Sequence, residues 1–69
     1  MNPDLYDAIR LSMLYTSIQD DLQIVYTEQG VYWDLGDEEA TGLLVDRATD
    51  LSQEADKVLK NFTRLAAKA

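Results

Sequence analysis

The chain has 69 residues, which is enough for one small domain with a modest core. Thirteen acidic residues against six basic ones give a formal net charge of −7, which disfavours direct binding to nucleic acid or to an anionic membrane surface. The sequence has no Cys and no His, which excludes disulfides, thiolate zinc sites and catalytic Ser–His or Cys–His pairs.

The first element begins with helix-start signals. Asn2 supplies a capping side chain, Pro3 suits the first helical position, and Asp4 suits the positive end of the helix dipole. Apolar residues then recur at alternating steps of three and four, which is the spacing of one helical face: Ala8, Leu11, Tyr15, Ile18, Leu22 and Val25. The pattern predicts a first helix over about residues 3–28.

The segment over residues 29–36 contains two of the three glycines and the only Trp. Gly30 is expected to end the first helix, so this segment is predicted to be an aromatic connecting turn. The alternative is an α+β fold with a short β-hairpin at residues 23–34, because this stretch is rich in β-branched and aromatic residues and Gln29-Gly30 suits a tight turn.

A second helix is predicted over about residues 37–67. Asp34 or Asp37 is a suitable capping residue, and Glu38 and Glu39 fall in the first turn, where the helix dipole favours anions. The apolar residues follow a heptad spacing: Leu44, Ala48, Leu51, Ala55, Val58, Phe62 and Leu65. The last turns carry basic residues, as the dipole prefers.

Two helices joined by a short turn pack antiparallel, so we expect residues 1–69 to form a single all-α domain, a two-helix hairpin. The first helix carries a second apolar stripe that one neighbour cannot cover, made by Tyr6, Ile9 and Met13. The favoured explanation is a homodimer that forms a four-helix bundle with this stripe as its interface. A different protein on the stripe, or Trp33 of the turn folded over Met13 or Tyr26, are the alternatives.

Acidic residues gather around the predicted turn, while residues 57–69 contain only basic charges. Tyr26, Tyr32 and Trp33 lie among the acids, and aromatic residues within a polar rim are typical of binding hot spots. We expect an acidic, aromatic surface that binds a basic patch of another protein through Asp20, Asp21, Glu28, Asp34, Asp37, Glu38 and Glu39 together with the three aromatic residues. The alternative is a solvated acidic cap whose aromatic residues close the end of the core.

The sequence offers no catalytic or metal-binding pattern, so we expect neither an enzyme nor a cofactor or metal. It contains no phosphate-binding glycine motif, and residues 34–39 lack the order of a calcium loop. Asp50 lies four residues from both Asp46 and Glu54, but these carboxylates lie off the apolar stripe, where solvation is the expected state.

The predicted function is therefore that of a protein-interaction module, an inhibitor or regulator that occupies a basic surface of its partner. Small acidic blockers of this general type occur among phage and mobile-element proteins, including anti-defence and anti-CRISPR proteins; this is an analogy of type only. The alternative is a hairpin adaptor or co-chaperone that offers its apolar stripe to a helical partner. The absence of Cys and of an N-terminal secretory pattern leads us to expect a cytoplasmic protein.

Overall fold

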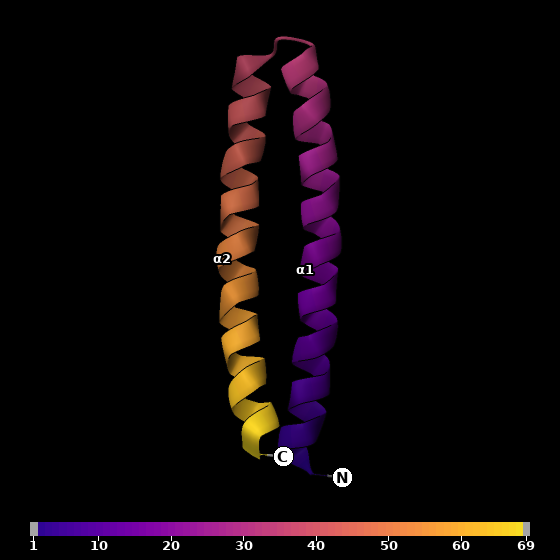
Figure 1. Ribbon diagram of the computed structural model, residues 1–69, viewed down its shortest axis with the longest axis vertical. Coiled ribbons are helices and arrows are strands. Elements are labelled where there is room, and N and C mark those ends of the chain that lie inside the picture. The colour runs from indigo at the N-terminus through magenta and orange to yellow at the C-terminus, as the bar shows by residue number, and fades with distance from the viewer. Residues whose placement is uncertain (1, 69) are drawn as a thin grey trace.

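The computed structural model describes residues 2–68, which form two long α-helices that lie side by side and run in opposite directions (Figure 1). α1 spans Pro3–Asp34 and α2 spans Glu38–Lys68, joined by residues 35–37. The Cα trace measures 51 × 14 × 11 Å, so the molecule is a rod one helix thick. The expected all-α antiparallel hairpin is confirmed, and the described residues contain no strand.

The start of α1 follows the predicted signals. The side-chain oxygen Oδ1 of Asn2 accepts a hydrogen bond of 2.9 Å from the backbone N–H of Asp4, and Pro3 occupies the first helical position, where its missing N–H costs no helical hydrogen bond. The capping prediction at this end is therefore confirmed.

The predicted end of α1 is wrong, because the helix passes through Gly30 and continues to Asp34. The β-hairpin at residues 23–34 is wrong for the same reason, and Thr27 hydrogen-bonds the carbonyl of Gln23 one helical turn back. A glycine inside a helix costs only about 1 kcal/mol relative to alanine. Val25 is buried and Gln29 half-buried, so α1 is still packed directly before Gly30, and the helix then continues with exposed residues to Asp34.

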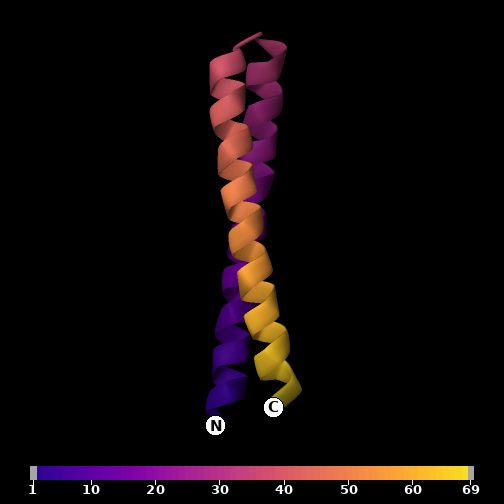
Figure 2. The ribbon, with the colours of Figure 1, turned by 90° about the vertical axis from the view of Figure 1, so that its left-hand side faces the viewer.

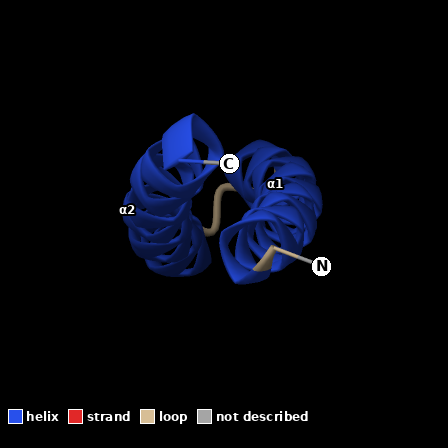
Figure 3. Ribbon diagram, turned by 90° about the horizontal axis from the view of Figure 1, so that it is seen from below, coloured by secondary structure: helices blue, strands red, loops and turns tan. Residues whose placement is uncertain are grey.

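The core lies along the seam between the helices, and the predicted heptad positions supply it. Its buried apolar residues are Ile18, Leu22 and Val25 from α1 and Ala48, Leu51, Ala55 and Val58 from α2. Leu11, Tyr15 and Leu44 pack against this cluster. The helices cross at a shallow angle and remain adjacent along the rod (Figures 2 and 3), as expected for a left-handed pair with a heptad repeat.

Two helices alone cannot enclose a core completely. No large side chain of residues 2–68 is fully buried, and most of the large apolar side chains outside the seam are exposed. The fold therefore has one packed seam and a broad accessible surface around it.

Candidate functional site

The connection between the helices is a compact, hydrogen-bonded turn at the tip of the rod, which we define as residues 31–39. Gly36 has a φ of +76°, the left-handed conformation that closes many helices. The N–H of Gly36 donates to the carbonyl of Trp33 at 3.0 Å, and the N–H of Asp37 donates to the carbonyl of Tyr32 at 3.0 Å. These two bonds form a Schellman motif and hold the backbone beneath both aromatic residues.

Asp37 also caps the start of α2, so the same residue completes the closing turn of α1 and begins the next helix. Its carboxylate accepts a hydrogen bond of 3.0 Å from the N–H of Ala40, and its carbonyl accepts a bond of 2.7 Å from the hydroxyl of Thr41. Of the two predicted capping residues the structure selects Asp37, because Asp34 lies in the last turn of α1. The tip is therefore ordered by its own backbone bonds.

Trp33 is the central side chain of the tip. It is 69% exposed and separates two shallow hollows. One is shared with Tyr26, Gln29 and Gly30 on α1, and the other with Gly36 and the first turn of α2. Because a large aromatic ring held on a rigid turn is costly to leave in water, Trp33 suits the role of a binding anchor.

The structure brings only part of the predicted acidic set together. Asp34, Asp37, Glu38 and Glu39 surround the turn and are exposed. Asp20 and Asp21 lie in the middle of α1, about 20 Å along the helix axis from Asp34 at 1.5 Å per residue, so their expected position near the turn is wrong. Glu28 lies between these two groups. The reason is the extension of α1 past Gly30, which moves the turn away from all three residues.

The aromatic residues are separated in the same way. Tyr32 and Trp33 belong to the tip, whereas Tyr26 lies about two helical turns lower on α1. Tyr26 is 51% exposed, so it does not close the end of the core, and neither does Trp33. The aromatic side chains at and near the tip are therefore accessible to solvent, as are the acids around them.

Three apolar residues at or near the tip were missed by the sequence analysis. Leu35 and Val31 flank the aromatic pair, and Leu43 follows one turn into α2; all three are exposed. Leu35 fell inside the predicted turn and had no periodic position to mark it. The signal that identifies it is Gly36-Asp37, a helix stop followed directly by a helix cap.

Charge is distributed along the rod as a dipole. The half of the molecule near the tip, residues 19–54, contains ten acids and only Arg47, a formal charge of −9. The half near the termini contains three acids and five bases, a formal charge of +2. The tip therefore carries a strong negative potential that attracts a cationic surface.

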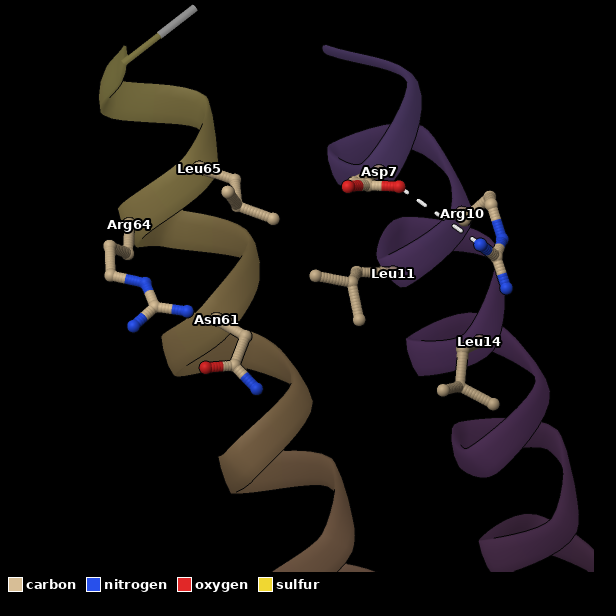
Figure 4. A pocket seen from close by; sticks show the side chains of 7 residues that line it. All are labelled: Asp7, Arg10, Leu11, Leu14, Asn61, Arg64 and Leu65. Carbon is tan, nitrogen blue, oxygen red and sulfur yellow. Dashed lines mark ion pairs between the residues drawn. The ribbon is translucent and has the colours of Figure 1, made fainter. Parts of the chain in front are cut away.

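The basic residues near the termini form no ion pair across the seam within residues 2–68. Arg10 pairs with Asp7 on its own helix at 4.0 Å, and this is the only ion pair within residues 2–68 (Figure 4). Arg64 lines the same groove from α2 without an ion pair to Asp7. An exposed pair of this kind contributes at most about 1 kcal/mol.

The predicted second stripe is confirmed as an accessible surface. Tyr6, Ile9 and Met13 are all exposed, and Met13 reaches 69%. The alternative in which Trp33 folds over Met13 is wrong, since 20 residues of helix place the two about 30 Å apart. Trp33 adjoins Tyr26 but leaves it half exposed, so the turn does not cover the stripe.

The described residues contain no group of acidic side chains arranged to hold a metal ion. Neither α1 nor α2 has an apolar stretch that would carry it across a lipid bilayer. The chain matches no protein-family profile, no curated protein and no solved structure.

Proposed function

We propose that this protein is a protein-binding module, an inhibitor or regulator that places the tip of its rod on a basic surface of a partner protein. The observation that carries the proposal is the 69% exposure of Trp33 on a hydrogen-bonded turn, surrounded by Asp34, Glu38 and Glu39. The acids accelerate the encounter with a cationic partner, and the aromatic residues provide the contact energy. We also propose that the protein acts in the cytoplasm and blocks its partner as small phage proteins do.

The shape of the rod supports a blocking role. The turn is short and closed by two backbone bonds, so little conformational entropy is lost when the tip is buried. Within residues 2–68 every Asp and Glu side chain lies on an exposed or half-exposed position. Contact with a protein surface is therefore the activity that this geometry serves best.

A second candidate function uses the side of the rod. The stripe of Tyr6, Ile9 and Met13 suits a helical partner that lays its own apolar face along α1, as adaptors and co-chaperones do. Met13→Asp abolishes such a complex, whereas binding through the tip survives this substitution.

The tip proposal is tested by capture from a cell lysate on three immobilised forms of the full chain. Glu38→Lys/Glu39→Lys reverses two tip acids, and Asp50→Lys/Glu54→Lys reverses two exposed acids in the middle of the same helix. Both changes alter the net charge equally, so general electrostatic attraction is matched. Asp37 is left intact because it caps α2.

We expect proteins that bind the wild type and the Asp50/Glu54 variant but not the Glu38/Glu39 variant. With such a protein purified, the association rate constant falls about tenfold from low to physiological salt, and Trp33→Ala weakens binding by about 30-fold or more. Equal loss of binding in both double variants, or a Trp33→Ala variant that binds normally, would contradict the proposal.

A further inference from the structure

The two sides of the hairpin differ in chemistry. Near the termini one groove between the helices is lined by Asp7, Arg10, Leu14, Asn61 and Arg64 around the core leucines (Figure 4). At the same level, the other groove is lined by Leu5, Ile9 and Met13 of α1 with Phe62 and Ala66 of α2. Residues two apart, such as Leu5 and Asp7, point about 200° apart on a helix, so the grooves open on opposite sides.

The same side of the rod continues toward the tip, with polar residues in its middle and apolar residues toward its ends. On α1, residues at every seventh position line this side: Leu5 and Ser12 in the groove near the termini, then Gln19, then Tyr26 and Trp33 in the hollows near the tip. Gln19 is half-buried, and Leu5, Tyr26 and Trp33 are exposed. A seven-residue spacing keeps these residues in one column along a helix pair.

A matching column runs along α2. Val45 and Ser52 share a hollow with Tyr26, Ala66 lies in the groove with Leu5, and Leu59 falls between them by the same spacing. We define the side that carries both columns as the apolar face. Leu59 is 43% exposed on it.

The apolar face is arranged almost symmetrically about the middle of the rod. On α1 the column is centred on Gln19, with Ser12 and Tyr26 at equal distances from it and Leu5 and Trp33 at twice that distance. If the rod is turned end over end onto itself, the small Ser12 meets the large Tyr26, and Leu5 meets Trp33. The Ser12–Tyr26 pair places a small residue opposite a large one, which close packing of facing helices favours. The Leu5–Trp33 pair brings two large apolar side chains together at each end.

The α2 column obeys the same symmetry. Ser52 and Leu59 lie on either side of the point between residues 55 and 56, and Val45 and Ala66 lie equally far from it. Ser12 shares a groove with Phe62, and Tyr26 shares a hollow with Ala48, so Gln19 lies level with about Ala55. Both columns are therefore symmetric about one level, and a single two-fold axis serves both.

Charge selects the same arrangement. A head-to-tail pair places the half with charge −9 beside the half with charge +2 of the second copy. A pair with both tips at one end brings the two negative halves together. Opposite charges across an interface favour association and like charges oppose it, so the head-to-tail direction is preferred.

The available area is sufficient for a stable dimer. The flat projection of the rod, 51 Å by 14 Å, is about 700 Å² for each copy. Specific protein interfaces bury about 600–1,000 Å² for each partner, and the projection of this rod falls within that range. A two-fold axis at the middle of the rod overlaps the two copies along their whole length, which uses this area fully.

We propose that a second copy of this chain packs head to tail on the apolar face, with α1 against α1 and α2 against α2, in a four-helix bundle whose two-fold axis lies level with Gln19. The interface has a direction and a register, so it makes definite contacts. The dimer proposal does not rest on the proposed tip function. Both use Trp33, so a basic partner competes with the second copy for the tip.

Single cysteines test the register, because the chain contains none of its own. On mild oxidation of the purified full chain, Gln19→Cys forms a disulfide with itself across the axis. Ser12→Cys forms one with Tyr26→Cys when the two variants are mixed, but not with itself, because the Ser12 positions of the two copies are far apart. Asp50→Cys, outside the apolar face, controls for random collisions.

The mass of the protein in solution tests whether the apolar face forms the dimer interface. The wild type sediments at twice its 7.8 kDa chain mass. Leu59→Glu raises the dimer dissociation constant by about 30-fold or more, whereas Leu14→Glu, at 46% exposure in the opposite groove, changes it by less than about threefold. Circular dichroism shows that both variants remain helical.

Three results would overturn the proposal: a monomeric wild type at 100 μM, a dimer without the Gln19→Cys disulfide, or equal effects of the two leucine substitutions. In a dimer that meets tip to tip, or in one with both tips at the same end, the two Gln19 residues do not face each other. Such a dimer therefore forms without the Gln19→Cys disulfide. Leu59→Glu leaves the tip intact and removes the competing second copy, so this variant captures a basic partner at least as well as the wild type, with or without a wild-type dimer. Failure of the dimer and failure of the tip function are therefore distinguishable.

Discussion

α1 and α2 have nearly equal lengths and share one core, but their remaining surfaces differ. Within residues 2–68 fourteen large apolar side chains are exposed, of which ten belong to α1, three to α2 and one to the turn. α2 is amphipathic, with charged residues on its outer face, whereas α1 is apolar around most of its circumference. A helix of the second kind is normally buried on more than one side.

The difference shows that the two helices have different roles in the molecule. α2 has its apolar surface largely matched by α1, and its outer face is charged and exposed. α1 meets α2 with one face and leaves further apolar surface for something else to cover. The proposed binding surfaces, the tip and the apolar face, therefore take most of their large apolar side chains from α1.

The largest expected change in stability distinguishes the inner face of α1, which packs on α2, from its outer face. Leu22 is 5% exposed in the core, so Leu22→Ala lowers the free energy of unfolding by about 2–5 kcal/mol. Ile24 is 57% exposed and lies off both the core and the apolar face, so Ile24→Ala changes it by less than about 0.5 kcal/mol. Urea denaturation followed by circular dichroism measures both. Similar losses for the two variants would show that the outer face of α1 is also packed.

The second test concerns the boundary between the helices. Gly36→Ala forces a side chain into a left-handed backbone conformation with φ +76°, and the open space around the residue offers no compensating contact. We expect a loss of about 1–2 kcal/mol in the free energy of unfolding. Gly36→Asn is the control, because asparagine tolerates this conformation better and restores part of the loss. A neutral Gly36→Ala would mean that the turn does not need its Schellman geometry.

The smallest effect has the opposite sign. Gly30 lies inside α1, and a methyl group added there meets no atom within 4 Å. Gly30→Ala therefore raises the free energy of unfolding by about 0.5–1 kcal/mol. Thermal unfolding of this variant beside Gly36→Ala sharpens the comparison, because two glycines six residues apart then move the melting temperature in opposite directions. A destabilised Gly30→Ala would place the end of α1 near residue 28.

The sequence by itself determined the two helices, their antiparallel pairing and the core. Heptad spacing decides which residues face a neighbour, and a short connection leaves only an antiparallel arrangement. Ile18, Leu22, Leu51 and Val58 were predicted core residues and are buried. The sequence also predicted an exposed stripe at Tyr6, Ile9 and Met13.

Only the tertiary structure decided where α1 ends. Gly30 costs only about 1 kcal/mol in a helix, so a local pattern that reads the glycine as a helix end does not decide whether the helix stops there. In the structure α1 continues for one more turn, to Asp34. The structure thereby separated Asp20 and Asp21 from the tip and placed Leu35 there. It also placed the columns of Leu5 and Leu59 on one side of the rod, which depends on how the helices are rotated against each other.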